Sequence, residues 1–458
     1  MASYANIPGV ITSVSDGNLR SGLDPSTPKV TLLGCTTNTT VKMNDPIRVI
    51  GSVTLSDFDL STGKPSELSR AIQECQDAGC DNIEVMVISR LAGDNDAGTL
   101  TDNGRFAALE TAYSLLLDHP VDIVVPVGAY IDEPLSSSNS FGYQLANFCY
   151  QSTKNFDSCL GVIGTTRPVT GTTSGGLSTI SLSDQSTYVD ALTDFSTASI
   201  LGTSFTSFNG VTDANTDGIP DSYGYYATTD EVLPTGSTPS TASTVVKDSN
   251  NNPVDIGAYI NVVAGLYRFK NNIASRQLPA DDAYDGDGAA AYAGLIAGLP
   301  PHDSPTNKSI NGPTLIRNYS LTQANSLAGK RYVVFREKAG VTKVLNGMTG
   351  AYNISTTYRS DFVRLTTIRI LHDAADRVRA VADPFIGRAN NGPNIQAFRA
   401  EIDQTLGRLQ TLGALRRYQF NIIATPAMQV LGQATVNLTL VPAFEITEIT
   451  VNIALAKE

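Results

Sequence analysis

One segment of this chain has the residue types and the spacing of a calcium-binding loop. Residues 213–221 match the pattern Asp-x-Asn-x-Asp-Gly-x-x-Asp, the first nine positions of such a loop. The oxygen ligands would be four side chains and one backbone carbonyl, supplied by Asp213, Asn215, Asp217, Ile219 and Asp221. Position twelve is Gly224 in place of the bidentate acid, and an ordinary surface turn favours the same residue types. Calcium is therefore a candidate cofactor, with a surface turn that binds no metal as the alternative.

Other residue patterns argue against catalysis. None of the three histidines, His119, His302 and His372, has another His or a Cys three to five residues away, so we expect no zinc site. The sequence contains no phosphate-binding loop, dinucleotide-binding turn or nucleophile elbow. We therefore expect no enzymatic activity. The alternative is a cytoplasmic α/β enzyme with an appended α+β domain, which would need convergent polar groups in the loops at 34–36 and 127–129, and these offer few.

The composition argues against secretion and against a membrane protein. No apolar run of the 458 residues reaches the roughly 18 residues that a spanning helix needs. The first residues lack the basic and apolar stretches of a signal peptide. The five cysteines are sparse and odd in number, which suits reduced thiols in a cytoplasm.

Charge is distributed unevenly along the chain. Residues 330–420 contain 15 Lys and Arg against 7 Asp and Glu, a net charge of +8, so the remainder carries −20 of the total of −12. Such polarity is typical either of nucleic-acid binding or of subunits that meet basic face to acidic face. The basic residues are almost all Arg and have no exposed aromatic residues interleaved, so we expect no nucleic-acid partner.

Apolar strands alternate with amphipathic helices in the first part of the chain. The expected strands are 29–35, 83–88, 121–127 and 160–164, and the expected helices are 65–79, 103–118 and 141–153. This alternation predicts an α/β fold with a mainly parallel sheet covered by helices. The Ser/Thr/Gly-rich residues 165–252 are expected to form a β-rich surface insertion, and residues 279–313 to be loop-like.

The C-terminal part predicts an α+β domain. Residues 332–336 and 341–345 would form a hairpin, followed by helices at 358–381 and 394–412 and by strands at 416–426 and 434–440. The first of these helices would pack through one apolar stripe, formed by Phe362, Leu365, Ile368, Leu371, Ala375 and Val378.

Both ends of the chain have the pattern of strands without a partner. Residues 7–14 form a short predicted strand, and the alternating run 449–455 places its apolar side chains on one face. An unpaired strand offers free N–H and C=O groups to another chain, so a neighbouring copy is the expected partner, with pairing inside the same domain as the alternative. The expected organisation is an N-terminal arm (1–20), an α/β region (21–330), a C-terminal α+β domain (331–445) and a C-terminal arm (446–458).

Six C-terminal segments follow one another in a distinctive order. They are Gly347-Met348-Thr349, the arginine-bearing helix after Tyr358, Phe385-Ile386-Gly387, Leu412-Gly413-Ala414-Leu415, Ala424-Thr425-Pro426 and Val441-Pro442-Ala443-Phe444-Glu445-Ile446. In this order they resemble the contractile tail sheath proteins of bacteriophages and related injection devices. The opening Ile7-Pro8-Gly9-Val10 also looks like the family's amino end.

The resemblance implies a subunit that stacks as six-membered rings around an inner tube and contracts to drive the tube through the host envelope. It implies as partners the chain itself, the inner tube protein, and baseplate and tail terminator proteins, with neither nucleic acid nor membrane, in a virion tail assembled in the host cytoplasm. It makes the two arms strand donors, through Gly9, Val10, Ile11, Val14, Ile449, Val451, Ile453 and Leu455. The receiving strand would be 332–336 or 419–424, and Arg399 and Arg408 are candidates for the tube-facing or inter-subunit face.

Overall fold

The computed structural model describes most of the chain outside its two ends and one long internal segment. The described residues are 28–49, 54–63, 65–91, 100–131, 141–155, 157–165, 256–270, 283–315, 319–351, 361–431 and 433–445. The predicted arms at 1–20 and 446–458, and nearly all of the predicted insertion at 165–252, lie outside these residues.

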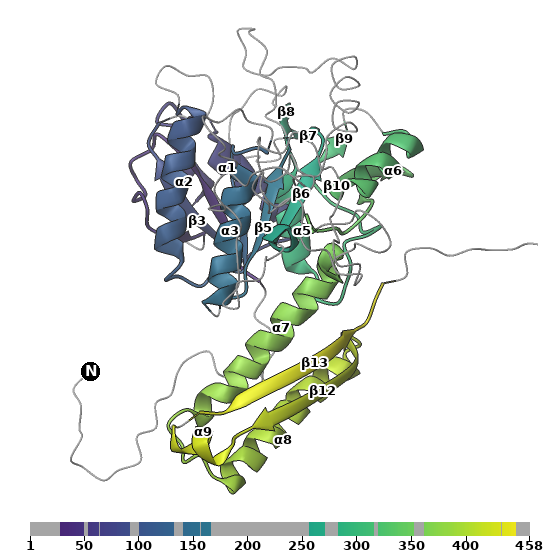
Figure 1. Ribbon diagram of the computed structural model, residues 1–458. Coiled ribbons are helices and arrows are strands. Elements are labelled where there is room, and N and C mark those ends of the chain that lie inside the picture. The colour runs from purple at the N-terminus through teal and green to yellow at the C-terminus, as the bar shows by residue number, and fades with distance from the viewer. Residues whose placement is uncertain are drawn as a thin grey trace, which may run out of the picture.

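An eight-stranded, mostly parallel sheet forms the centre of the larger unit, which we call the α/β body (Figure 1). Its spatial order is β11-β10-β6-β5-β4-β1-β3-β2, in which β2 and β11 run antiparallel to their neighbours. The strands are β1 (Val30–Cys35), β2 (Ile47–Arg48), β3 (Ile83–Ser89), β4 (Ile123–Pro126), β5 (Leu160–Gly164), β6 (Ile260–Ala264), β10 (Tyr332–Lys338) and β11 (Val341–Val344). Every residue of β1, β3, β4, β5 and β6 is buried, as expected for strands covered on both faces.

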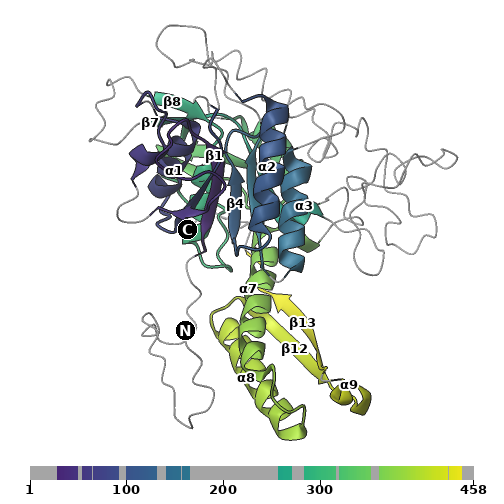
Figure 2. The ribbon, with the colours of Figure 1, turned by 90° about the vertical axis from the view of Figure 1, so that its left-hand side faces the viewer.

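Helices cover both faces of this sheet (Figure 2). The helices on one face are α1 (Glu67–Asp77) and α5 (Ala289–Gly298), and those on the other are α2 (Asp102–Leu116), α3 (Phe141–Lys154) and α6 (Leu321–Gly329). Two short 3-10 helices pack against these helices: η1 (Leu55–Phe58) against α1, and η3 (Ile256–Tyr259) against α3. A separate small antiparallel sheet contains β7 (Tyr267–Lys270), β8 (Ala283–Gly286) and β9 (Thr314–Leu315). The predicted α/β fold with a mainly parallel sheet is confirmed.

A smaller unit, the C-terminal lobe, lies below the α/β body in Figure 1. It consists of α7 (Leu365–Ala382), α8 (Gly392–Thr411), α9 (Pro426–Val430) and a hairpin of β12 (Leu415–Ile423) and β13 (Thr435–Pro442). Two 3-10 turns, η4 (Asp361–Val363) and η5 (Asp383–Phe385), flank α7. Gly413 has φ 81° after α8, which confirms its predicted role as the stop of that helix.

Helix α7 belongs to both units. Leu365 and Ile368 near its start are buried in the core between the sheet, α1 and α5. Ile370, Ala374 and Val378 are buried in the separate core of the C-terminal lobe. A single straight element is therefore held by two hydrophobic cores, which joins the lobe to the body without a flexible linker between these contacts.

The structure differs from three sequence-based expectations. Residues 279–313 are not a loop, because they contain α5, all of whose residues but one are buried. The predicted apolar stripe of α7 is wrong at Leu371, which is 39% exposed, since the helix turns its second half toward a different core. The hairpin of β10 and β11 does not open the C-terminal lobe, because β10 pairs in parallel with β6 in the central sheet.

Candidate assembly surface

The hairpin of the C-terminal lobe has one apolar and one polar face. Its apolar face packs on α7 and α8 and is formed by Tyr418, Phe420, Ile422, Val436, Leu438 and Leu440. The residues between them on the outer face, among them Gln419, Asn421, Asn437 and Thr439, are exposed. This alternation places the hairpin as a half-covered two-stranded sheet.

Two strands are fewer than a stable sheet usually has. Strand β12 pairs with β13 along one edge, and among the described residues no other strand pairs with either of them. Isolated two-stranded hairpins are marginally stable in water, and free edges bind further strands. The hairpin therefore offers an acceptor edge on each side.

A groove beside β13 gives one of these edges room for another segment. The groove has a volume of about 900 Å³ and lies between α7 and β13. Its walls include Ile370 and Leu371 from α7 and Leu438 and Leu440 from β13. Leu371 and Phe444, which also line the groove, are 39% and 60% exposed. An extended apolar segment placed here could cover both side chains and bond to the strand edge.

Of the two strands predicted to accept an arm from another copy, only one has an unpaired edge among the described residues. Residues 332–336 lie in β10, which pairs with β6 through Tyr332–Val334 and with β11 from Phe335 onward. That strand has neighbours on both sides, so it is not an open edge. The expectation for 332–336 is therefore wrong, whereas residues 419–423 of β12 remain an open acceptor edge among the described residues.

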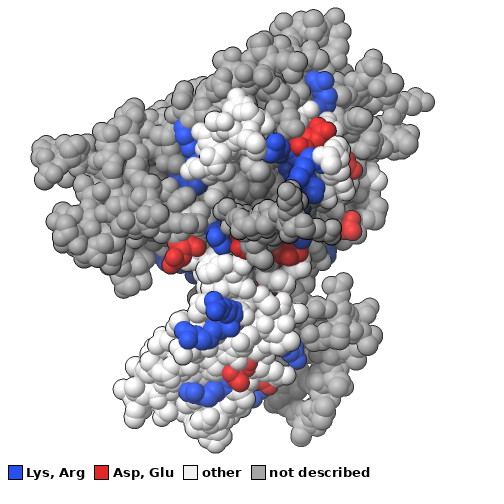
Figure 3. Space-filling view, turned by 90° about the vertical axis from the view of Figure 1, so that its right-hand side faces the viewer, with Lys and Arg blue, Asp and Glu red and all other residues white. Residues whose placement is uncertain are grey.

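Arginine side chains lie on the surface of the same lobe. Arg399 and Arg408 of α8 are both exposed, and the Arg399 guanidinium lies over the Phe420 ring at 5.8 Å. Figure 3 shows Lys and Arg at several places on one face of this lobe and fewer Asp and Glu. Their exposure leaves these two arginines available to a partner, and their contact with the inner tube or another copy stays a prediction.

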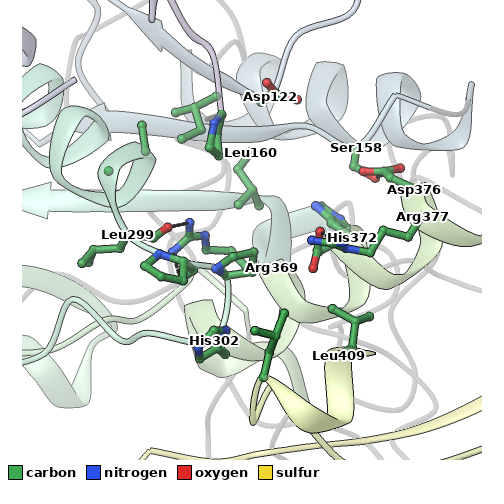
Figure 4. A pocket seen from close by; sticks show the side chains of 18 of the residues that line it. Asp122, Ser158, Leu160, Leu299, His302, Arg369, His372, Asp376, Arg377 and Leu409 are labelled. Carbon is green, nitrogen blue, oxygen red and sulfur yellow. Dashed lines mark hydrogen bonds and ion pairs between the residues drawn. The ribbon is translucent and has the colours of Figure 1, made fainter. Parts of the chain in front are cut away.

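A second cavity, of about 630 Å³, lies where α7 meets the α/β body (Figure 4). Its polar side chains are engaged by their own chain: Asp376 accepts a hydrogen bond from Ser158 at 2.8 Å, and Arg377 pairs with Asp373 at 2.8 Å. Burial, and secondarily the charge of Arg379, lowers the pKa of His372 to about 3, so this imidazole is neutral at physiological pH. The hydrogen bond between Ser158 and Asp376 joins α7 to the α/β body at this cavity.

The carboxyl edge of the parallel sheet is where enzymes of this architecture bind ligands. Here Arg105 of α2, whose side chain is fully buried, lies at the carboxyl ends of β1 and β4, with its Nη1 3.8 Å from Cys35 Sγ. Its guanidinium donates to the carbonyl oxygen of Val127 at 2.8 Å and pairs with Glu67 at 3.2 Å. Gly128, with φ 74°, leaves room for this pair, since a Cβ there would stand 2.5 Å from both Arg105 Nη1 and Glu67 Oε2. This ion pair occupies the loop that follows β4.

Two groups of predicted site residues lie outside the described residues. They are the predicted strand donors Gly9, Val10, Ile11, Val14, Ile449, Val451, Ile453 and Leu455, and the candidate calcium loop Asp213–Asp221. Within the described part of the chain, no cluster of three His, Cys, Asp or Glu residues could hold a metal ion. None of the helices described there is long and apolar enough to span a membrane.

No protein-family model and no curated protein matches the chain. The helical sheath of the anti-feeding prophage, in its contracted state, superposes with a TM-score of 0.55 at 12% identity, over 98% of this chain and 99% of that one. The chain has the fold of a contractile tail sheath protein. The resemblance drawn from the C-terminal residues is confirmed.

Two further structures share this sheath fold. The sheath of the extracellular contractile injection system PVC, also contracted, matches with a TM-score of 0.57 at 11% identity, over 99% of this chain and 98% of that one. The sheath tail protein of Desulfitobacterium hafniense matches with a TM-score of 0.50 at 9% identity, over 95% and 100% of the two chains. Because the match extends over whole chains, the sheath fold includes both the α/β body and the C-terminal lobe.

Proposed function

We propose that this protein is the structural subunit of a contractile tail sheath. Copies would polymerise as stacked hexameric rings around an inner tube and contract to drive that tube through the host envelope. The observation that carries the proposal is the fold match over the whole length of two sheaths in their contracted state. The buried ion pair of Arg105 and Glu67 at the carboxyl ends of β1 and β4 also favours a structural role for that part of the sheet edge.

The open hairpin edges support a specific mode of assembly. The N-terminal and C-terminal arms of neighbouring copies would add strands to β12 and β13, with Ile449, Val451, Ile453 and Leu455 turned toward the apolar side. Such pairing would satisfy the free backbone groups of both the donor and the acceptor. It would also connect each subunit to several others through paired strands, in addition to contacts between subunit surfaces.

Microscopy of the purified protein tests the assembly, because hollow cylinders are expected from the full-length chain. Removing residues 446–458 should leave a folded monomer that forms no cylinders. A sharper pair of variants replaces Ile449, Val451 and Ile453 by Asn, or the alternating Thr450 and Asn452 by Ala. The first should abolish assembly and the second should preserve it. Cylinders of normal length from the truncated or the Asn-substituted chain would refute strand donation.

The remaining partners follow from the same proposal. The sheath would bind an inner tube protein, a baseplate and a tail terminator, in a virion tail assembled in the host cytoplasm, with neither nucleic acid nor membrane as a ligand. Arg399 and Arg408 are proposed to face the tube or an adjacent subunit. Replacing both by Glu should weaken co-sedimentation of tube and sheath or shorten the cylinders, whereas Arg388→Glu, on the exposed loop after η5, serves as the charge control.

No resident cofactor is proposed for this function. Calcium at Asp213, Asn215, Asp217, Ile219 and Asp221 stays a separate prediction from the sequence. Metal analysis and limited proteolysis before and after chelation test it directly. Unchanged metal content and unchanged cleavage between residues 213 and 221 would remove calcium from consideration.

A further inference from the structure

The last described residues of the chain are tied to the first turn of α7. The hydroxyl of Thr366 donates a hydrogen bond to Glu445 Oε2 at 2.7 Å, and Arg364 Nε lies 3.8 Å from Glu445 Oε1. The Arg364 guanidinium also stands over the Phe444 ring at 5.3 Å. The two residues that precede the C-terminal arm therefore both contact the residues that begin α7.

The contact between Thr366 and Glu445 is largely shielded from water and electrostatically favourable. Thr366 is 2% exposed and the Glu445 side chain 13%. The first turn of a helix presents unpaired N–H groups and the positive end of the helix dipole, which favour a carboxylate. Arg364, the N-cap residue of α7, makes no side-chain capping bond, so Glu445 supplies from the far end of the chain the acidic group that the helix start lacks.

The position of Glu445 matters because β13 is held along only one edge in the described structure. Its ladder ends with Pro442 opposite Leu415, and one more backbone bond joins Ala443 N to Ala414 O at 2.9 Å. Without a further contact, a force applied at residue 446 would act on the last pairs of the β12–β13 ladder and separate them one after another. Because Glu445 is bonded to Thr366, the force acts on α7 instead.

Helix α7 can take that load because its start lies inside the α/β body. Leu365, adjacent to Thr366, is fully buried in the core of the body, and Ile368 is 2% exposed in the same core. One turn connects the Glu445 contact to those side chains. Glu445 is thus connected to the core of the α/β body through the first turn of α7, and not through the core of the C-terminal lobe.

We infer that Glu445, with Thr366 and Arg364, is a positioning site that anchors the root of the C-terminal arm and transmits tension from it to the α/β body. The inference rests on the proposed function, in which residues 446–458 pair with another copy. In an assembled sheath, this anchor keeps β13 on β12 while neighbouring subunits pull on the arm. It also sets the direction in which the arm leaves the lobe.

The test uses full-length protein assembled into cylinders, with their survival under sonication as the readout. Glu445→Ala and Thr366→Val should each shorten the half-life of the cylinders by about tenfold, the effect of losing one charge-assisted hydrogen bond. Glu445→Gln keeps an acceptor for Thr366 and should recover part of the loss. The double variant Thr366→Val/Glu445→Ala should be no worse than Glu445→Ala, because both changes remove the same contact. Glu401→Ala, an exposed glutamate of α8, is the matched control and should behave as wild type.

A second measurement separates anchoring from a general effect on stability. Hydrogen exchange of unassembled Glu445→Ala protein should accelerate at the last amides of β13 while α8 and the central sheet keep wild-type protection. If wild-type and Glu445→Ala cylinders have the same half-life under sonication, the inference is overturned and the proposed function is unaffected. A full-length wild-type chain that forms no cylinders would overturn the proposed function and this inference with it.

Discussion

The guanidinium Nη2 of Arg369 in α7 donates a hydrogen bond to the carbonyl oxygen of Ile296 in α5 at 2.8 Å. The same side chain also reaches the carbonyl oxygens of Leu299 at 2.7 Å and Pro300 at 3.3 Å. One arginine therefore donates to three carbonyls at and just beyond the end of α5, where the last turn of a helix leaves carbonyls without intrahelical donors. Burial lowers the pKa of Arg369 to about 10, which still leaves it protonated at neutral pH.

Replacing Arg369 should loosen the joint between the C-terminal lobe and the α/β body. In Arg369→Met the carbonyl of Leu299 loses its guanidinium donor, and those of Ile296 and Pro300 keep only the backbone N–H groups of Leu299 and Asp303. The free energy of unfolding should fall by about 3 kcal/mol. Arg369→Lys should recover only part of this, because one ammonium cannot reproduce the forked geometry. Urea unfolding measures the loss. A matched control is Arg416→Met on exposed β12, and an Arg369→Met protein as stable as that control would contradict the role of Arg369.

His372 should make the folded chain sensitive to mild acid. An unfolded histidine binds a proton below its ordinary pKa of 6.5, whereas the buried His372 does so only near pH 3. The unfolded state therefore binds more protons in this window, and stability must fall as the pH falls from 6.5 toward 3. Between pH 7.5 and pH 5 the loss from this one group should be about 2 kcal/mol.

The substitution His372→Gln removes the titrating group and should flatten this part of the stability profile. Denaturant unfolding at pH 7.5, 6 and 5 measures the change. His302→Gln, which changes another histidine at the same cavity, serves as the control. An unaltered acid slope in His372→Gln would show that the pH dependence arises elsewhere.

Gly294 should tolerate no side chain. It lies on α5 where that helix crosses α1, and a Cβ there would stand 2.5 Å from the carbonyl oxygen of Cys75. Gly294→Ala should therefore force the two helices apart and lower the free energy of unfolding by about 2 kcal/mol. Gly329→Ala in α6 is the control, since a Cβ there would meet no atom within 4 Å and should be neutral or slightly stabilising. Equal melting temperatures for the two variants would count against close packing of α1 and α5.

Arg105 should matter for folding and not for any ligand. Arg105→Met would remove the hydrogen bond to the Val127 carbonyl and the ion pair with Glu67, which should lower the free energy of unfolding by about 3 kcal/mol. Combining it with Glu67→Gln should cost less than the sum of the single changes, because the pair acts as a unit. Thermal unfolding of the four proteins measures this coupling, and strict additivity would argue against the pair.

Regular periodicity made most elements of the α/β body predictable. The strand at 83–88 and the helices at 103–118 and 141–153 were expected within a few residues of β3, α2 and α3, because a short apolar run there alternates with longer segments of helix length. Helix α5 was missed for the opposite reason. Its residues are small and apolar on every side, as a helix buried all round must be, so no amphipathic pattern distinguishes it from an Ala/Gly-rich loop.

In the C-terminal lobe, too, some elements could be predicted from the sequence and others could not. The strands β12 and β13 follow from their alternation, and the stop of α8 follows from Gly413. The burial of α7 could not be predicted from one helical stripe, because Ile368 and Ile370 face different cores. A charged Arg369 between these two buried isoleucines was a signal for a buried contact, although the sequence does not show which carbonyls it meets.

The sequence by itself determined the α/β class and most of the strands and helices described here, because these depend on neighbours a few residues apart. The strand patterns at the two chain ends stay predictions. The tertiary structure alone decided that α7 joins two cores, that Arg105 lies at the carboxyl ends of β1 and β4, and that Glu445 meets Thr366. Each of these contacts joins residues brought together only by packing: 38 positions separate Arg105 from Glu67, and 79 separate Thr366 from Glu445. Local pattern carries no information about such pairs, since their geometry exists only once the sheet and both cores have formed.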